Sequence, residues 1–236
     1  MNKLILQGHE LMKDCGFPYY ICGGFALDMF AGKELRTHWD LDISTFKEHK
    51  LDLVEFLQSK GWDTWKRVYE PSTLGGITPI IDKSDSKLED IRNIWAIKEG
   101  SHLVPKPRND GTDVYDFDIL ANEQTGFHFI EMVLDNKSGN DFLVNPTKGI
   151  VRQMDKAVLY ADGIPHLAPE VILLLKSPEV YTTHEYHAHK TPGDFRAILP
   201  LLPAESKQWL SNSLKTLFPD GLPWLSEILE ELLWTK

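Results

Sequence analysis

The feature that most constrains the fold of this chain is a pair of aspartates, Asp40 and Asp42, set one residue apart beside a predicted strand over residues 41–46. Side chains at positions i and i+2 of a strand point to the same face. Two carboxylates held side by side repel each other unless a positive charge lies between them. The chain is therefore expected to fold around a cation at this point, and a divalent metal that prefers oxygen ligands, most often Mg²⁺, meets that need.

A pair of glycines, Gly23 and Gly24, precedes the aspartates by one short predicted helix. Glycines ahead of a helix let backbone N–H groups approach a phosphate. Each pair alone has an ordinary structural explanation, but a strand, a glycine pair, a helix, a turn and a strand with two same-face aspartates form a specific order. A phosphate loop with metal-binding carboxylates is typical of proteins that transfer a phosphoryl or nucleotidyl group.

Composition and charge narrow the class of protein. A chain of 236 residues with 42% hydrophobic residues is long and apolar enough to fold around a core. Its formal net charge of -10 disfavours nucleic acid as a partner and suits a small-molecule enzyme, particularly one with a cationic acceptor. The chain has two cysteines, and their spacing is not that of metal ligands, so free thiols are expected. Its first residues form an amphipathic pattern and not a signal peptide, and no membrane span is found, so a cytoplasmic protein is expected.

The pattern of apolar residues predicts an α+β (mixed α/β) protein with a division near residue 145. A catalytic domain over residues 1–145 is expected to contain most of the strands, and a subdomain over residues 146–236 is expected to be helical. Predicted helices cover 2–15, 25–31, 47–60, 148–160, 167–176, 194–202, 204–218 and 222–234, and predicted strands cover 19–22, 41–46, 63–69, 94–98, 114–120 and 127–134. Residues 71–90 are expected to be irregular, as in a lid.

The residues around the two pairs form a longer motif. The chain reads Phe-Pro-Tyr-Tyr-Ile-Cys-Gly-Gly-Phe-Ala-Leu-Asp over residues 17–28, followed by Gly32, Arg36, His38, Asp40 and Asp42. This segment resembles the nucleotidyltransferase superfamily, which has the DNA polymerase beta-like fold, and within it the aminoglycoside and lincosamide antibiotic nucleotidyltransferases. The family motif reads Gly-Gly-aromatic-Ala-hydrophobic-Asp, then Arg-x-His-x-Asp-x-Asp, and the chain matches each position. Cys22 stands where the family often has a third glycine.

The resemblance implies a small mixed sheet flanked by helices, a helical C-terminal subdomain, and a third carboxylate on a later strand. Asp116 and Asp118 share a face of the predicted strand over residues 114–120, so their spacing does not choose between them. Asp118 is preferred because it lies between Phe117 and Ile119. Asp40, Asp42 and Asp118 are the expected metal ligands for one or two Mg²⁺ ions, and Asp118 is also a candidate general base.

The resemblance also implies which residues bind the nucleotide, which is expected to be ATP or another nucleoside triphosphate. Gly23 and Gly24 are expected to approach the phosphates, while Asp28 caps or orients the loop. Arg36, His38 and Lys176 are the other expected nucleotide-binding residues, the last because it ends an apolar helix in a pattern found in nucleotidyltransferase-like proteins. Lys190 precedes Asp194 and Phe195 in the same pattern, although Thr191 follows it where the family often has Asp.

We therefore expect a metal-dependent nucleotidyltransferase that moves AMP from ATP to a hydroxyl of a small molecule, with an aminoglycoside-type antibiotic as the leading acceptor and antibiotic resistance as the outcome. Nucleotidyl transfer to RNA or protein is an alternative in another substrate class. A degenerate homologue that binds nucleotide without turnover is a third. The acceptor is expected near residues 71–90, and His184, His187 and His189 are expected to be a solvated loop and not a metal site.

Overall fold

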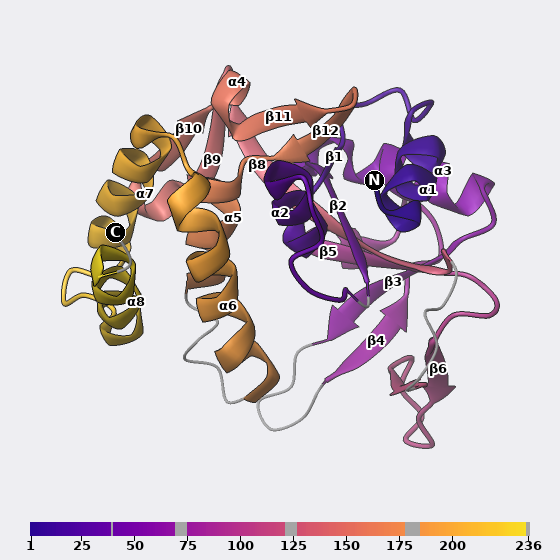
Figure 1. Cartoon of the computed structure of the whole chain (residues 1–236). Coiled ribbons are helices and arrows are strands. Elements are labelled where there is room, and N and C mark those ends of the chain that lie inside the picture. The colour runs from indigo at the N-terminus through magenta and orange to yellow at the C-terminus, as the bar shows by residue number, and fades with distance from the viewer. Residues whose placement is uncertain (39, 69–74, 121–126, 178–184, 235–236) are drawn as a thin grey trace. The chain divides into compact units, whose positions relative to one another are not determined.

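A computed structural model describes residues 1–38, 40–68, 75–120, 127–177 and 185–234 (Figure 1). Its contacts divide the chain into two compact units: unit 1 comprises residues 1–21 and 38–136, and unit 2 comprises residues 22–37 and 137–236. The division predicted at residue 145 instead placed residues 22–37 in the first half. The glycine pair and the aspartate pair therefore belong to different units.

Unit 1 is built on a mixed sheet that is flanked by helices (Figure 1). Its strands follow the order β1 (Tyr20–Ile21), β2 (Leu41–Phe46), β8 (Phe129–Ser138), β5 (Asn93–Ile97), β3 (Asp63–Val68), β4 (Gly76–Pro79), β7 (Tyr115–Ile119) and β6 (Leu103–Pro107). Strands β2 and β8 are parallel, and the other neighbouring pairs are antiparallel. The predicted mixed α/β class is confirmed, although the sheet has more strands than the pattern predicted.

Two helices, α1 (Lys3–Met12) and α3 (Lys50–Ser59), pack against the apolar side of this sheet. Leu41 and Ile43 are buried on that side, so Asp42 between them faces the other way. Gly8 allows the close approach of α1, because a Cβ at this position would lie 2.5 Å from Leu41 Cδ2. The helices thus cover one face of β2 and leave the other for the aspartates.

The opposite side of the same sheet carries an aromatic cluster. Its buried members are Trp65, Ile77, Trp95, Ile97, Leu103 and Phe129, with Tyr115 and Phe117 packed against them. The ring of Trp95 meets Phe117 and Phe129 edge to face, with centroid distances of 5.3 and 5.4 Å. The hairpin of β6 and β7 is therefore anchored through the residues of β7 that alternate with Asp116 and Asp118.

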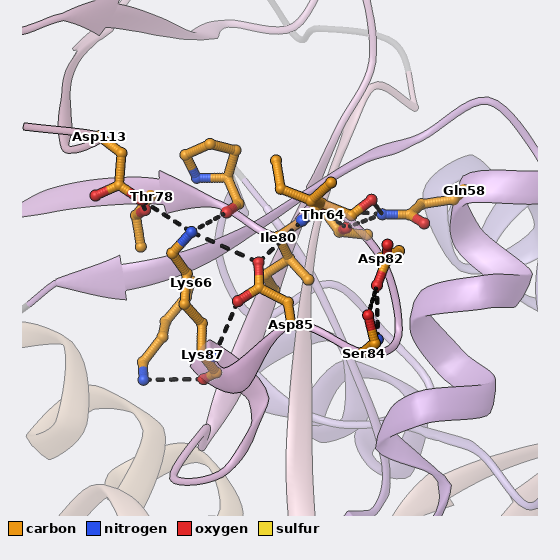
Figure 2. Close-up of polar contacts among 12 residues, drawn as sticks. Gln58, Thr64, Lys66, Thr78, Ile80, Asp82, Ser84, Asp85, Lys87 and Asp113 are labelled. Atoms are coloured by element: carbon orange, nitrogen blue, oxygen red, sulfur yellow. Dashed lines mark hydrogen bonds and ion pairs between the residues drawn. The ribbon is translucent and has the colours of Figure 1, made fainter.

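Residues 76–90 are tied to the sheet by the polar contacts that Figure 2 shows. Lys87 Nζ lies 2.9 Å from an oxygen of Asp113 and donates to the carbonyl of Pro79, and Lys66 Nζ donates to the carbonyl of Lys87. Gln58 donates to the carbonyl of Ile80. Part of the segment predicted as an irregular lid thus forms strand β4 and a 3₁₀ turn (η2, Ser86–Leu88), joined by a connection that these hydrogen bonds hold to the sheet. Residues 71–74 lie outside the described residues.

Unit 2 combines short strands with helices. Its elements are α2 (Gly23–Ala31), β9 (Asp141–Asn145), β10 (Ile150–Gln153), α4 (Met154–Ala157), β11 (Val158–Ala161), β12 (Ile164–Leu167), α5 (Pro169–Lys176), α6 (Glu185–Ile198), α7 (Ala204–Leu217) and α8 (Pro223–Trp234), with 3₁₀ turns at Pro146–Lys148 (η3) and Leu199–Leu201 (η5). Helix α5 packs against α2, α6 and α7, and α6 packs against α8. Among the described residues, no helix has the length and apolar character needed to cross a membrane.

The helix predicted over residues 148–160 is wrong. Gly149 adopts a left-handed conformation with φ 66°, which interrupts a helix, and residues 150–153 pair with β9 as strand β10. Residues 158–161 then form β11, an antiparallel partner of β12. The second half of the chain is therefore mostly helical only from α5 onward, with the short helix α4 (Met154–Ala157) between β10 and β11.

A buried ion network holds the helices of unit 2 to β10. Arg152 donates to Glu170 at 2.6 Å and to Glu205 at 2.7 Å, and its guanidinium lies 5.0 Å from the ring centroid of Trp209. Ser206 donates to the same Glu170 oxygen at 2.9 Å. Arg152 and Glu170 are only 4% and 2% exposed, so the protein itself supplies the countercharge for each.

Candidate active site

Three carboxylates meet on the face of the unit 1 sheet that α1 and α3 leave open. Asp40, Asp42 and Glu131 each place an oxygen so that all three atoms lie within 4.8 Å of one another, and all three residues are half-buried. The parallel pairing of β2 with β8 sets Asp42 directly beside Glu131. Asp40 lies two residues before Asp42, so the strand period brings it to the same face.

Glu131 is the member of this group that the sequence interpretation missed. It lies between Ile130 and Met132, both fully buried, in a strand otherwise read only as apolar. A charged residue inside an apolar strand is itself a signal, because an ionised carboxylate is costly to bury without a partner. That signal was present in residues 127–134 and was not used.

The surroundings of Glu131 both raise and lower the pKa of its carboxyl. Burial raises the pKa of the Glu131 carboxyl, and the nearby charge of Asp40 raises it further. A hydrogen bond donated by the Asn93 side chain and the charge of Arg67 act to lower this pKa. Arg67 itself lies over the ring of Trp95, 5.1 Å from its centroid. The net shift is upward, so the buried carboxyl holds a proton more readily than an exposed glutamate does.

Asp118, the residue preferred as the third carboxylate, does not join this group. It pairs with Lys106 across the hairpin, and Asp116 pairs with Arg108 at 2.7 Å; both aspartates are exposed. The physical reason is strand alternation, since Phe117 points into the aromatic cluster and its two neighbours point away from it. Among the described residues, the acid that lies with Asp40 and Asp42 is Glu131 and not Asp118.

The group fits a magnesium ion by its chemistry. Carboxylate oxygens are the hard ligands that Mg²⁺ prefers. The three oxygens lie within 4.8 Å of one another, so Asp40, Asp42 and Glu131 could hold one divalent cation together. The negative charge gathered on this face also favours a cation over any neutral ligand.

The glycine pair opens helix α2 in unit 2, as the sequence predicted. Gly23 begins the helix with φ 61°, a left-handed conformation that glycine adopts without strain, and Gly24 is buried. Asp28, further along the helix, is 8% exposed and accepts a hydrogen bond from the backbone N–H of Leu35 at 3.0 Å. It therefore orients the turn that leads from α2 toward Arg36.

Arg36 and Lys176 meet at one buried carboxylate of unit 2. Lys176 Nζ lies 2.8 Å from Asp194 Oδ2, and Arg36 Nε lies 3.2 Å from Asp194 Oδ1. Burial alone would raise the pKa of Asp194, which is 3% exposed, but Lys176 and then Arg36 hold it below its ordinary value. The sequence motif contained all three residues, and the structure shows that Asp194 contacts both cations.

The remaining predicted residues are placed as follows. His38 is half-buried in unit 1, two residues before Asp40. Lys190 is half-buried in α6 of unit 2. His184 lies outside the described residues. His187 and His189 belong to helix α6, so the predicted loop is wrong at these two residues. Their side chains lie outside the described residues, so their exposure to solvent and the expectation that they bind no metal stay predictions.

One family model matches the chain. Residues 4–77 match the family described as Aminoglycoside-2''-adenylyltransferase. The matched range contains the glycine pair and the aspartates Asp40 and Asp42. The match confirms, over that range, the predicted resemblance to aminoglycoside nucleotidyltransferases. No curated protein matches the chain at a significant level.

Several solved structures are similar to the chain at low identity. The crystal structure of the lincosamide antibiotic adenylyltransferase LnuA bound to lincomycin has 16% identity and a TM-score of 0.48, and covers 82% of this chain and 96% of that one. The solution structure of the antibiotic-resistance factor ANT(2'')-Ia has 14% identity, a TM-score of 0.49 and 92% coverage of both chains. An antigenic nucleotidyltransferase-like protein from Paracoccidioides brasiliensis has 17% identity and a TM-score of 0.44, and covers 96% of this chain and 90% of that one.

Proposed function

We propose that this protein is a metal-dependent nucleotidyltransferase that moves AMP from ATP to a hydroxyl of a small molecule, with an aminoglycoside antibiotic as the leading acceptor. The observation that carries the proposal is the acidic group of Asp40, Asp42 and Glu131, two members of which lie in the segment that matches an aminoglycoside adenylyltransferase family. Three carboxylates on one face cost folding free energy through their repulsion, which a divalent cation would relieve.

Asp40, Asp42 and Glu131 would hold one or two Mg²⁺ ions. When bound there, Mg²⁺ would neutralise the triphosphate oxygens and favour attack at the α-phosphorus. The acceptor hydroxyl oxygen forms a bond to the α-phosphorus, the bond from that phosphorus to the bridging oxygen breaks, and pyrophosphate leaves. Glu131 takes the role first given to Asp118, as a metal ligand or as the base that accepts the hydroxyl proton.

The triphosphate would be bound by backbone N–H groups at Gly23 and Gly24 and by the side chains of Arg36, His38 and Lys176. The start of a helix favours an anion through its unpaired N–H groups and its dipole. Lys176 and Arg36 both contact Asp194, so two cationic side chains lie together in unit 2. Two adjacent cations support the assignment of the pair to phosphate binding.

The acceptor is proposed from charge and from the family match. A formal net charge of -10 attracts a polycationic acceptor, as aminoglycosides are, and repels RNA. ATP is a cytoplasmic co-substrate, which agrees with the free cysteines Cys15 and Cys22, and we propose a cytoplasmic enzyme of antibiotic resistance on that basis.

The proposal is tested with ATP labelled at the α-phosphate, Mg²⁺ and a panel of aminoglycosides and lincosamides. With wild type we expect labelled drug and one unlabelled pyrophosphate for each drug molecule modified. Asp118→Asn should give the same products, and Asp40→Asn should give neither. Label on tRNA or on protein, with no drug modified, would replace the acceptor class. Nucleotide binding without Mg²⁺-dependent turnover toward any acceptor would show that the protein is not a transferase.

A further inference from the structure

Asn93 is a polar residue that touches the acidic group without being an acid. It opens strand β5, where the four residues that follow it, Ile94 to Ile97, are all buried. The antiparallel pairing of β5 with β8 sets Trp95 opposite Glu131 and Asn93 opposite Val133, so Asn93 lies diagonal to Glu131 on the same face. From there its Nδ2 donates a hydrogen bond to Glu131 Oε1.

The choice of an amide at this place has an electrostatic consequence. Glu131 lies beside two other carboxylates, and a side chain with free rotamers would turn away from Asp40 to reduce the repulsion. The amide of Asn93 holds one carboxylate oxygen and brings no net charge. A lysine or arginine in the same position would fill the place of the cation, whereas a neutral donor leaves that place to a metal.

We propose that Asn93 is a positioning residue for the metal: it fixes the Glu131 carboxylate in the orientation that lets Asp40, Asp42 and Glu131 bind one divalent cation together. The inference rests on the proposed function and adds to it a residue that neither the motif nor the matched segment contains, since that segment ends at residue 77. Partners that orient a ligating carboxylate change metal affinity by about 10- to 100-fold when they are removed.

The experiment measures Mn²⁺ binding to the full chain by the EPR signal of free Mn²⁺, in the absence of nucleotide, so it does not depend on turnover. The variants are Asn93→Ala, Glu131→Gln and the double variant. Thr64→Ala is the matched control. Thr64 is a buried β3 residue, and its replacement removes hydrogen bonds to Gln58 and Ile80 but no contact with an acid. Far-UV circular dichroism confirms that each variant is folded.

We expect the Kd for Mn²⁺ to rise about 10-fold or more in Asn93→Ala and to stay unchanged in Thr64→Ala. In the Glu131→Gln background, removing the Asn93 amide should have no further effect, because Asn93 acts through Glu131. Transfer activity is also measured as a function of Mg²⁺ concentration. The Mg²⁺ concentration that gives half-maximal activity should be higher in Asn93→Ala than in wild type, and the maximal rate at saturating Mg²⁺ should be largely recovered.

Two results would overturn the inference in different ways. If wild type binds Mn²⁺ and Asn93→Ala binds it equally well, or if the effect persists in the Glu131→Gln background, Asn93 does not position Glu131 and the proposed function still stands. If wild type shows no Mn²⁺ binding and no divalent-cation dependence of transfer, the metal site itself is absent and both proposals fail.

Discussion

The two units treat their buried acids in opposite ways. Unit 1 gathers Asp40, Asp42 and Glu131 on one face, where like charges lie within 4.8 Å. Two buried acids of unit 2 contact cations: Glu170 lies 2.6 Å from Arg152, and Asp194 contacts Lys176 and Arg36. The pKa values differ in the same sense, since that of Glu131 is raised by burial and by Asp40, and that of Asp194 is lowered by its cations despite burial.

The comparison distinguishes acids that stabilise the fold by pairing with cations from acids that are grouped in a way that suits a bound cation. A buried acid paired with a cation contributes to a defined arrangement, and removing the cation leaves an uncompensated charge. Carboxylates that gather on one face of a sheet repel one another, so such a group points to a function. Substitutions in the acidic group of unit 1 should therefore change activity, and substitutions in the Arg152–Glu170 pair of unit 2 should change stability.

The largest effect is expected at Asp42. Replacing it with Asn removes a proposed metal ligand, and the loss of several kcal/mol of charge stabilisation corresponds to a fall in transfer rate of about 1,000-fold. The midpoint of thermal unfolding should not fall, because one source of repulsion is gone. A rate assay and a melting curve on the same preparation check both parts; a variant that melts much earlier than wild type would contradict the comparison.

The next effect is expected at Arg152, on stability. Arg152→Met leaves the carboxylate of Glu170 buried without its cation, which should lower the free energy of unfolding by about 3–5 kcal/mol. The second change Glu170→Met should restore most of that loss, since both charges are then absent. Urea unfolding of wild type and of the single and double variants measures the coupling, and a double variant less stable than the single one would contradict it.

Asp194 should make the protein sensitive to acid. Its pKa is lowered in the folded state, so the stability that its charge contributes is present above its unfolded pKa and is lost as the pH falls through the folded value. Asp194→Asn should be less stable than wild type at neutral pH, and the difference should shrink toward low pH. Unfolding midpoints measured in a pH series test this, and a difference that stays constant would exclude the linkage.

Asp135 in unit 1 should change the pH dependence of stability in the opposite direction to Asp194. Burial raises the pKa of its carboxyl, although Tyr20 donates to it at 2.8 Å. Stability from the protonated form is present below the unfolded pKa and is lost as the pH rises through the folded value. Asp135→Asn should therefore gain stability relative to wild type as the pH increases, in the same series of measurements. A relative gain toward low pH would contradict it.

The smallest effect is expected at Lys87, whose contacts appear in Figure 2. Its ion pair with Asp113 joins a half-buried lysine to an exposed acid, and such pairs contribute about 1 kcal/mol or less. Lys87→Met should lower stability by that amount and leave transfer activity unchanged. A strong loss of activity would show instead that residues 80–90 contribute to the site.

The sequence predicted what lies close together along the chain. The glycine pair, the aspartate pair and the residue Asp28 are local, because each follows from the spacing within one strand or one helix turn. Glu131 was not predictable from spacing, since its place beside Asp42 depends on which strand pairs with β2. The position of Asp118 outside the acidic group has the same origin: alternation shows which residues share a face, but not which face is covered.

Long-range pairing also explains the other differences. Residues 150–153 form a strand because β9 lies beside them, and Gly149 ends any helix before it. Arg36 and Lys176 were named separately, and only the structure shows that Asp194 joins them. In each case the missing information was a partner distant in the sequence, which local propensity does not contain.

The direct pairing of Asp42 with Glu131 also serves as a check on folding. Side chains alternate along a strand, so a slip of one residue between β8 and β2 would turn Glu131 toward the apolar side covered by α1 and α3 and would bring Ile130 or Met132 among the aspartates. Burying that charge among apolar side chains is prohibitive. A chain with the wrong register would thus be unstable and inactive at once, so the acids proposed for catalysis also select the correct arrangement of the sheet.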